Sequence, residues 1–475
     1  MSFSEDILYG SVRDLGRGLR KNSYSAVDLA LAYLERLEKL GPRYGALVTL
    51  TRDRALAEAR RATTELRVGK DRGPLHGIPY GVKDLLAARG APTTWGAAPF
   101  RDQVIDADAT VVERLGAAGA VLIAKLSMVE LAGGMGYEQA DASFTGPGRT
   151  PWNPAYWSGG SSSGPGAAVA AAMVPFAIGS ETWGSIFFPS MACGVSGLRP
   201  TYGRVSRHGA MALSWTMEKL GPMARTADDC GLVLAAIAGA NPNDPTAAAR
   251  RFRYPGPKRS TRLRIGVLKD ATLGVQPEVA RSFDDAVEVL GTFATLVRDF
   301  ELPDLPYDAA AGVIIQAEGA SAFEDLLASG RVKELSAPED HRNGYVGSVV
   351  LATDYIKALR VRGVAARALN QALAGVDCYV APTLDTVTYP ISKPFEEAWP
   401  TIEIPKDQKP PPISGGAANL VGLPGLAVPN GFGKDGLPTS ICFTARSWND
   451  AAVVDAAREY QARTDWHRRR PPIEA

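Results

Sequence analysis

The chain has 475 residues, of which 45% are hydrophobic, and its 52 basic and 51 acidic side chains leave a net charge of +1. These values exclude a disordered chain and a strongly basic nucleic-acid-binding protein. The length corresponds to about three ordinary domains or to one unusually large α/β domain. The four cysteines contain no C-x-x-C pair and are too few to staple a chain this long, so we expect reduced thiols and no metal site.

The first ten residues carry acidic side chains where a signal peptide would carry a basic segment followed by an apolar run. The longest nearly apolar stretch, Gly166 to Gly179, has 14 residues, against about 20 that a membrane-spanning helix needs. We therefore predict a cytoplasmic protein in which this stretch is a buried helix.

Helical and strand patterns alternate along the chain. Ser25 and Asp28 form a capping box before apolar residues at the spacing of one helical face. A helical pattern over residues 108–115 precedes residues 120–124, an apolar run typical of a buried strand. Further on, the pattern predicts strands at residues 263–267 and 378–381 and helices at residues 278–290 and 355–373. This alternation predicts an α/β fold: a single large domain with a central mixed, mostly parallel β-sheet flanked by helices.

Residues 385–413 differ from the rest of the chain because they are rich in proline. Such a segment predicts a long excursion over the surface, and long loops in compact domains often have a function. A lid over a site and a plain loop both fit this pattern. A second unusual segment, the Gly/Ser-rich run from Trp157 to Gly166, is typical of a linker, but an apolar helix follows it rather than a change of domain.

Gly160 to Gly164 match the G-x-S-x-G nucleophile elbow of α/β-hydrolases, which requires a strand before the serine. The preceding segment, Arg149 to Tyr156, carries two prolines and cannot be a central strand. A Ser-His-Asp mechanism is disfavoured because no evident acid partner accompanies any of the histidines, which are His76, His208, His341 and His467. The P-loop pattern with its lysine is absent, so nucleotide binding is excluded.

A serine without a histidine needs another base, and a lysine can serve where burial lowers its pKa toward neutrality. Lys83 is the best candidate, because an apolar run ends in this one cation, as expected of an amine carried inward on a strand. A structural role is the alternative, in which Lys83 pairs with Asp84 at the end of the strand.

Three long motifs occur in order: HGIPYGVKD at residues 76–84, GGSSSGPGAAVAA at residues 159–171 and GSETWGSIFFPSMACGVSGLRPT at residues 179–201. Together they resemble the amidase signature family of serine hydrolases, and the similarity runs nearly end to end, with a signature core at about residues 75–226. The resemblance implies a catalytic set of Lys83, Ser161 on a cis peptide bond, and the nucleophile Ser185. It also implies an oxyanion hole built from the backbone N–H groups of four successive residues, Thr182, Trp183, Gly184 and Ser185. No cofactor and no metal are implied.

The chain departs from the family pattern at two positions: Trp183 stands where a second glycine is usual, and Phe187 stands where an arginine is usual. Losing the arginine removes a buried cation, and both replacements predict a pocket that favours aryl or hydrophobic substrates. The alternative is that both rings pack in the core, and the sequence leaves it open. Matching the segment before Gly133 to the family's corresponding loop places Ala132 and Gly133 in the opposite wall of the cleft.

The predicted function is hydrolysis of carboxamides through an acyl-enzyme on Ser185, with carbamate (urethane) and ester hydrolysis as further activities. We expect a small-molecule amide or carbamate substrate, no nucleic acid, no membrane, and a monomer or homodimer. Three alternatives are the amidase subunit of a glutamine-dependent tRNA amidotransferase, a membrane-associated hydrolase of lipid amides, and a non-catalytic binding protein on the same fold. The apolar replacements disfavour the first alternative, and the intact catalytic positions disfavour the third.

Overall fold

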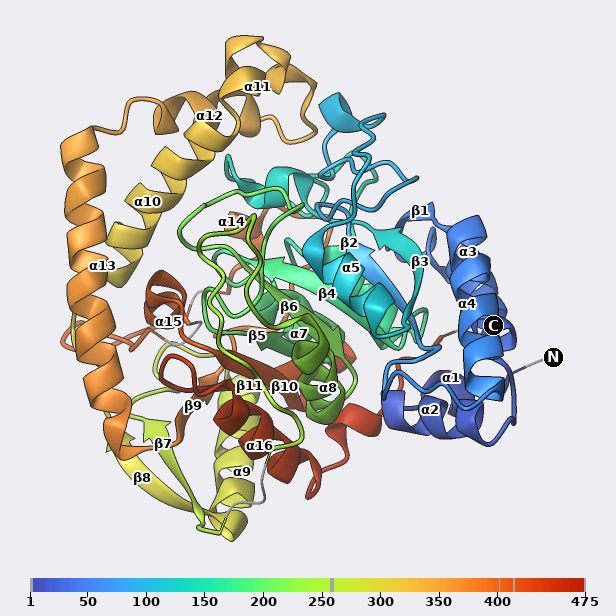
Figure 1. Cartoon of the computed structure of the whole chain (residues 1–475). Helices are drawn as coiled ribbons and strands as arrows, with labels where there is room; N and C mark the ends of the chain where they lie inside the picture. Colours follow the sequence, from blue (N-terminus) through green and yellow to red (C-terminus); the bar gives the residue numbers. More distant parts are fainter. Residues whose placement is uncertain (1–2, 257–259, 401, 413–414, 474–475) are drawn as a thin grey trace.

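The computed structural model describes residues 3–256, 260–400, 402–412 and 415–473. Within these residues, eleven strands form one sheet in the order β1-β3-β2-β4-β6-β5-β10-β11-β9-β7-β8, and the helices pack around it (Figure 1). The strands are β1 (Leu47–Leu50), β2 (Pro79–Lys83), β3 (Val121–Leu126), β4 (Phe176–Glu181), β5 (Ser196–Arg199), β6 (Lys219–Ala224), β7 (Leu263–Leu268), β8 (Ala294–Phe300), β9 (Cys378–Pro382), β10 (Gly425–Phe432) and β11 (Pro438–Thr444).

The sheet is mixed, as predicted, but parallel pairs are in the minority. Among the described strands, four of ten pairings are parallel, namely β2 with β3, β2 with β4, β7 with β8 and β7 with β9. The other six pairings are antiparallel. Short connections explain part of this excess: only residues 433–437 join β10 to β11, and a connection this short permits an antiparallel pair but not a parallel one.

The helices are α1 (Glu5–Leu8), α2 (Val12–Arg20), α3 (Ala26–Leu40), α4 (Arg52–Arg67), α5 (Thr110–Ala117), α6 (Ser163–Ala170), α7 (Phe187–Cys193), α8 (Ala227–Ile237), α9 (Pro277–Phe293), α10 (Tyr307–Ala322), α11 (Glu324–Ala328), α12 (Asp340–Gly347), α13 (Ala352–Ala372), α14 (Phe395–Ala398), α15 (Gly416–Val421) and α16 (Asp450–Gln461). Short 3₁₀ turns occur at η1 (Ala98–Phe100), η2 (Glu130–Gly133), η3 (Arg331–Glu334), η4 (Leu373–Gly375), η5 (Lys434–Gly436) and η6 (Trp466–Arg468). Over the described ranges, no helix combines the length and the apolar character that crossing a bilayer demands.

Most local predictions are confirmed, including the Ser25–Asp28 capping box at the start of α3 and the α5–β3 unit. The predicted buried helix from Gly166 to Gly179 is wrong. Helix α6 ends at Ala170, and strand β4 begins at Phe176 after a short turn in which Ala172 adopts a φ of 51°. Every residue of this stretch is buried, and an apolar run without polar positions cannot distinguish a helix from a strand.

The first part of the proline-rich segment, residues 385–413, does not run freely over the surface. Tyr389 is buried, and its carbonyl accepts a hydrogen bond of 2.8 Å from the backbone N–H of Trp157. Phe395, on α14, stacks on the indole of Trp157 with ring centroids 4.8 Å apart. These contacts fasten the segment to the Gly/Ser-rich run. Its role as a lid stays a prediction, and residues 401 and 413 lie outside the described residues.

Candidate active site

Lys83 lies at the end of β2, a strand whose five residues are all buried between β3 and β4. Its Nζ donates hydrogen bonds to two serine hydroxyls, at 2.7 Å to Ser161 Oγ and at 3.0 Å to Ser180 Oγ. The alternative pairing of Lys83 with Asp84 is wrong, because Asp84 forms its ion pair with Lys125, whose Nζ is 2.6 Å from Asp84 Oδ1. The structure therefore brings Lys83 and Ser161 together.

Burial controls the charge of the Lys83 amine. The side chain is fully buried, and desolvation lowers the pKa of Lys83 from the usual 10.5 to about 7, although the carboxylates of Glu218 and Glu181 act in the opposite direction. A substantial fraction of the amine is therefore uncharged at neutral pH. An uncharged amine that already contacts a hydroxyl can accept its proton.

The backbone before Ser161 takes an unusual course. The Gly160–Ser161 peptide bond is cis, as the resemblance implied, and Gly159 has a φ of 79°. A Cβ atom on Gly159 would lie 2.8 Å from the backbone nitrogen of Pro189 in α7. No side chain fits at Gly159, because the loop and the helix approach each other too closely there.

Ser185 lies half-buried on the wall of a cavity of about 380 Å³, just before α7. The backbone N–H of Ser162 donates a hydrogen bond of 3.2 Å to the carbonyl of Ser185, so the two serine-bearing loops are in direct contact. The preceding residue, Gly184, has a φ of 90°, which a residue with a side chain rarely adopts. The cavity lining consists of Ala132, Gly133, Tyr137, Gly160, Thr182, Trp183, Gly184, Ser185, Phe187, Phe188, Leu213, Ile315 and Leu384.

The backbone N–H groups from Thr182 to Ser185 donate to no acceptor among the described residues. The next two N–H groups are used differently, because those of Ile186 and Phe187 donate to Glu181 Oε2 at 2.8 and 3.0 Å. Unpaired N–H groups are uncommon in protein interiors. Successive free donors beside a serine on a cavity wall can stabilise negative charge on a substrate oxygen.

A buried cation lies beside Phe187, although position 187 itself carries none. Arg199, on β5, is fully buried and donates to Glu181 Oε1 at 2.8 Å. Its guanidinium also lies over the ring of Phe187, 4.4 Å from the ring centroid. Position 187 itself carries an apolar ring, and the carboxylate of Glu181 has its cationic partner in Arg199.

Trp183 and Phe187, the two aromatic residues that depart from the family pattern, both line the cavity. Phe187 is in addition buried against Arg199. Trp183, Gly133 and Ile315 also line a second hollow of about 500 Å³. These three residues therefore form the partition between the cavity at Ser185 and the second hollow. The sequence identified Ala132 and Gly133 for the opposite wall. It gave no signal for Ile315 or for the other cavity-lining residues that lie far away in the chain, Leu213 and Leu384.

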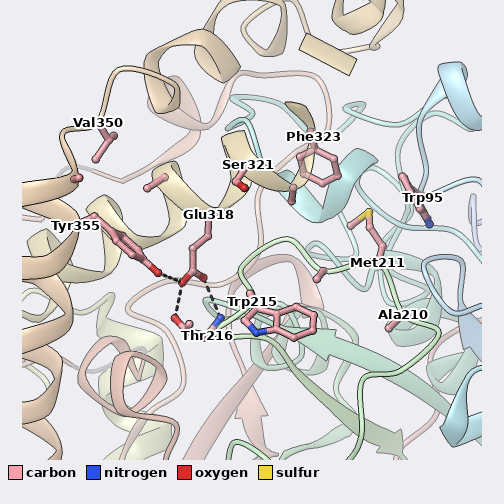
Figure 2. A pocket seen from close by; sticks show the side chains of 14 residues that line it. Trp95, Ala210, Met211, Trp215, Thr216, Glu318, Ser321, Phe323, Val350 and Tyr355 are labelled. Carbon is pink, nitrogen blue, oxygen red and sulfur yellow. Dashed lines mark hydrogen bonds between the residues drawn. The ribbon is translucent and has the colours of Figure 1, made fainter. Parts of the chain in front are cut away.

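A larger hollow of about 780 Å³ is lined by Met211 and Trp215, from the segment before β6 (Figure 2). Leu213, which lies between them in the chain, lines the cavity at Ser185 instead. Among its described lining residues, the only carboxylate is that of Glu318, on α10. This carboxylate accepts hydrogen bonds from Tyr355 Oη, on α13, and from the backbone N–H and hydroxyl of Thr216. These hydrogen bonds connect α10 to α13 and to the segment before β6, so we interpret Glu318 as a structural residue. The candidate catalytic site is therefore the cavity at Ser185.

Comparison with known proteins decides the family. The family model described as Amidase matches residues 28–454. The chain belongs to the amidase family. This amidase is 34% identical to a Methylococcus capsulatus protein named as one of the subunits of glutamyl-tRNA(Gln) amidotransferase, over 97% of this chain and 98% of the relative. It is 36% identical to a protein of the same name from a Roseiflexus species, over 98% of both chains. The resemblance to the amidase signature family is thus confirmed.

Solved structures agree on the fold of this amidase. The peptide amidase of Stenotrophomonas maltophilia has a TM-score of 0.82 and 30% identity, over 98% of both chains. A chain of a protein complex described as revealing the evolutionary origins of an s-triazine catabolic enzyme has a TM-score of 0.86 and 29% identity, over 96% of this chain and 98% of that chain. The predicted fold, one large α/β domain with a mixed sheet, is confirmed.

The comparisons contradict the partners that we expected. We predicted a chain that handles small molecules only, as a monomer or homodimer without nucleic acid. The two relatives quoted above are named as subunits of a glutamyl-tRNA(Gln) amidotransferase. Both relatives match almost the whole chain, at 34% and 36% identity. The prediction of a protein that acts without other subunits and without tRNA is therefore wrong. The prediction rested on two apolar replacements, Trp183 and Phe187, and these change the wall of one cavity rather than the outer surface.

Proposed function

We propose that this amidase hydrolyses carboxamides through an acyl-enzyme on Ser185, with Lys83 as the base and Ser161 as the proton carrier between them. The contact that carries the proposal is the 2.7 Å hydrogen bond from Lys83 Nζ to Ser161 Oγ. It joins a fully buried amine of lowered pKa to a hydroxyl on the loop that contacts Ser185. A reactive serine needs such a proton acceptor, and no histidine lines the cavity as described.

The proposed reaction has two stages. Ser185 Oγ attacks the amide carbonyl carbon, Ser161 takes the Ser185 proton, and Ser161 passes its own proton to Lys83. The same path run backwards protonates the nitrogen of the leaving group, so the carbon–nitrogen bond breaks and an amine or ammonia departs. Water then attacks the acyl-enzyme with the same base and releases the carboxylic acid. In both stages the free N–H groups from Thr182 to Ser185 stabilise the oxyanion.

The lining of the cavity supports a neutral, apolar acyl or aryl group in the substrate. Trp183, Phe187 and Phe188 provide aromatic surface. Neither this cavity nor the adjoining 500 Å³ hollow has a lysine or an arginine among its described lining residues, and the hollow contains the carboxylate of Asp308. A substrate carboxylate would therefore find no cation there. Ester and carbamate cleavage would use the same groups, and both stay predictions.

A second candidate function is that of the amide-cleaving subunit of an amidotransferase, with glutamine as the nitrogen donor. The names of the two relatives at 34% and 36% identity favour it. The absence of a cation from the described lining opposes it, since free glutamine carries a carboxylate that needs a partner. The two candidates share the chemistry at Ser185 and differ in the acyl group.

One experiment separates these candidates. The purified chain is given glutamine, an aryl amide, a fatty amide and an aryl carbamate, and kcat/KM is measured from the ammonia, amine or alcohol released. The proposal predicts the highest value for an apolar or aryl carboxamide. A clear preference for glutamine would establish the second candidate instead. Failure to cleave any of the four, with a folded chain, would refute the first candidate and would leave a binding protein or the second candidate, whose relatives are named as subunits of a larger enzyme. Ser185→Ala is the control for a contaminating hydrolase.

A further inference from the structure

Four buried charged side chains lie beneath the loop of residues 182–187, and we call them the buried charge cluster: Glu181, Arg199, Glu218 and Lys219. Each of them contacts the loop or a side chain that does. Glu181 accepts the N–H groups of Ile186 and Phe187, and it is paired with Arg199. Glu218 Oε2 accepts a hydrogen bond from the hydroxyl of Thr182. The mechanism proposed above uses none of these four side chains directly.

Lys219 makes the contact that matters most for the oxyanion hole. It begins β6 and lies opposite Glu181 in the antiparallel pair of β4 and β6. Its side chain is 2% exposed. Nζ donates at 3.3 Å to the carbonyl oxygen of Thr182 and at 3.0 Å to Oδ1 of Asn419, on α15. Lys219 therefore connects Thr182, the residue before Trp183, to helix α15.

The geometry of the peptide group explains why a hydrogen bond to the Thr182 carbonyl affects the N–H donor of Trp183. In a trans peptide the C=O of one residue and the N–H of the next point in opposite directions. The carbonyl of Thr182 is turned toward Lys219, so the N–H of Trp183 points away from it. Trp183 lines the cavity, and its N–H has no acceptor among the described residues.

We propose that Lys219 is a positioning residue: it holds the Thr182 carbonyl so that the N–H of Trp183 faces the substrate oxyanion, and its positive charge strengthens that N–H as a donor. The inference rests on the proposed function at Ser185. It concerns a residue that touches no reacting atom and acts through one peptide group. Because a cation behind the carbonyl draws electron density from the peptide, the donor on the other side becomes stronger.

Charge balance in the interior favours a protonated Lys219. Glu181 and Glu218 contribute two negative charges and Arg199 one positive charge. A proton on Lys219 makes the buried charge cluster neutral, and Lys83 can then remain uncharged, as a base must.

The charge on Lys219 has a consequence for the pH dependence. Burial lowers the pKa of Lys219 to about 7, Arg199 and Arg207 add to that effect, and Glu181 and Glu218 oppose it. The pKa of Lys83 is lowered to the same value, so the two limbs of the pH profile should meet near pH 7. Lys83 must lose its proton for activity, so the rate rises as pH passes the pKa of Lys83. Lys219 must keep its proton, so the rate falls as pH passes the pKa of Lys219. The two requirements together predict a bell-shaped profile.

The test compares Lys219→Met, Lys219→Gln and the wild type. Methionine keeps the length and burial of the side chain and removes both the charge and the donor, whereas glutamine keeps a neutral donor. For each protein, kcat and KM are measured from about pH 5.5 to about pH 9.5 with a para-nitrophenyl ester and the matching para-nitroanilide. Lys269→Met is the control, since Lys269 is exposed and pairs with Glu301 on the surface. Thermal unfolding midpoints show whether each variant folds.

We expect Lys219→Met to lower kcat by about 10- to 100-fold with little change in KM, somewhat less than the loss of a whole oxyanion donor. Its profile should lose the alkaline limb and only rise with pH. Lys219→Gln should recover part of kcat, because the donor is restored, and should also lack the alkaline limb. Lys269→Met should keep the bell. If the methionine variant fails to fold, the profile of the glutamine variant decides.

The proposal is overturned if the alkaline limb persists in a folded Lys219 variant, if the wild type has none, or if KM changes while kcat does not. A purely structural role would lower the unfolding midpoint and leave the shape of the profile unchanged. A wild type that cleaves neither substrate refutes the function proposed for Ser185, and this inference with it. A wild type with a bell that the Lys219 variants retain refutes this inference alone.

Discussion

The partition formed by Trp183 offers the sharpest test of how the cavity selects its substrate. Trp183 lies between the 380 Å³ cavity at Ser185 and the 500 Å³ hollow. Trp183→Ala removes the indole and connects the two spaces, so an acyl chain too long for the cavity can extend into the hollow. Each methylene buried there is worth about 0.8 kcal/mol, which corresponds to about fourfold in kcat/KM. In the wild type, methylenes beyond the partition should give no gain.

The assay is a series of straight-chain acyl para-nitroanilides of increasing length, with kcat/KM measured for each. The optimum should move to longer chains in Trp183→Ala, and the shortest substrates should lose activity because they lose contact with the indole. Leu384→Ala is the matched control, because Leu384 lines the cavity at Ser185 but not the second hollow. It should enlarge the cavity without moving the optimum as far. An identical optimum in Trp183→Ala and the wild type would show that the indole does not limit the substrate.

Three further predictions concern the groups around the nucleophile. Ser185→Ala should abolish turnover and leave the thermal unfolding midpoint unchanged, and retained turnover would exclude Ser185 as the nucleophile. Lys83→Met should lower kcat by about 10²- to 10⁴-fold, and wild-type kcat/KM should rise with pH toward about 7, as Lys83 becomes uncharged, before the alkaline fall expected from Lys219; activity that is lost in His208→Ala and kept in Lys83→Met would point to a histidine mechanism. Glu181→Gln should cost about 3–5 kcal/mol in urea unfolding, because it leaves Arg199 charged and unpaired in the interior, and a change below about 1 kcal/mol would show that the pair contributes little.

Much of the fold follows from local patterns. The capping box at Ser25 predicts the start of α3, and the apolar run before Lys83 predicts the buried strand β2. Prediction failed from Gly166 to Gly179, where α6 and β4 follow each other without a polar residue between them. Periodicity is a signal of partial burial, so a segment buried on all sides carries little of it.

The residues of the candidate site also fall into two groups, those that the sequence predicted and those that it did not. Lys83, Ser161 and Ser185 were identified from motifs, because each stands at a fixed place in a long run of matching residues. The buried cation Arg199 was missed, although it lies within one of those motifs, since nothing local indicates that its guanidinium reaches Glu181 on another strand.

By itself, the sequence indicated the family, the alternation of helices and strands, and the side chains that we propose to be reactive. The tertiary structure decided what those side chains experience. It alone showed that Lys83 is fully buried, which lowers the pKa of its amine to about 7. It also showed that Trp183 lines two hollows and that Lys219 contacts the Thr182 carbonyl. The physical reason is that desolvation, charge pairing and cavity shape depend on groups distant in the chain, and only packing determines which of them meet.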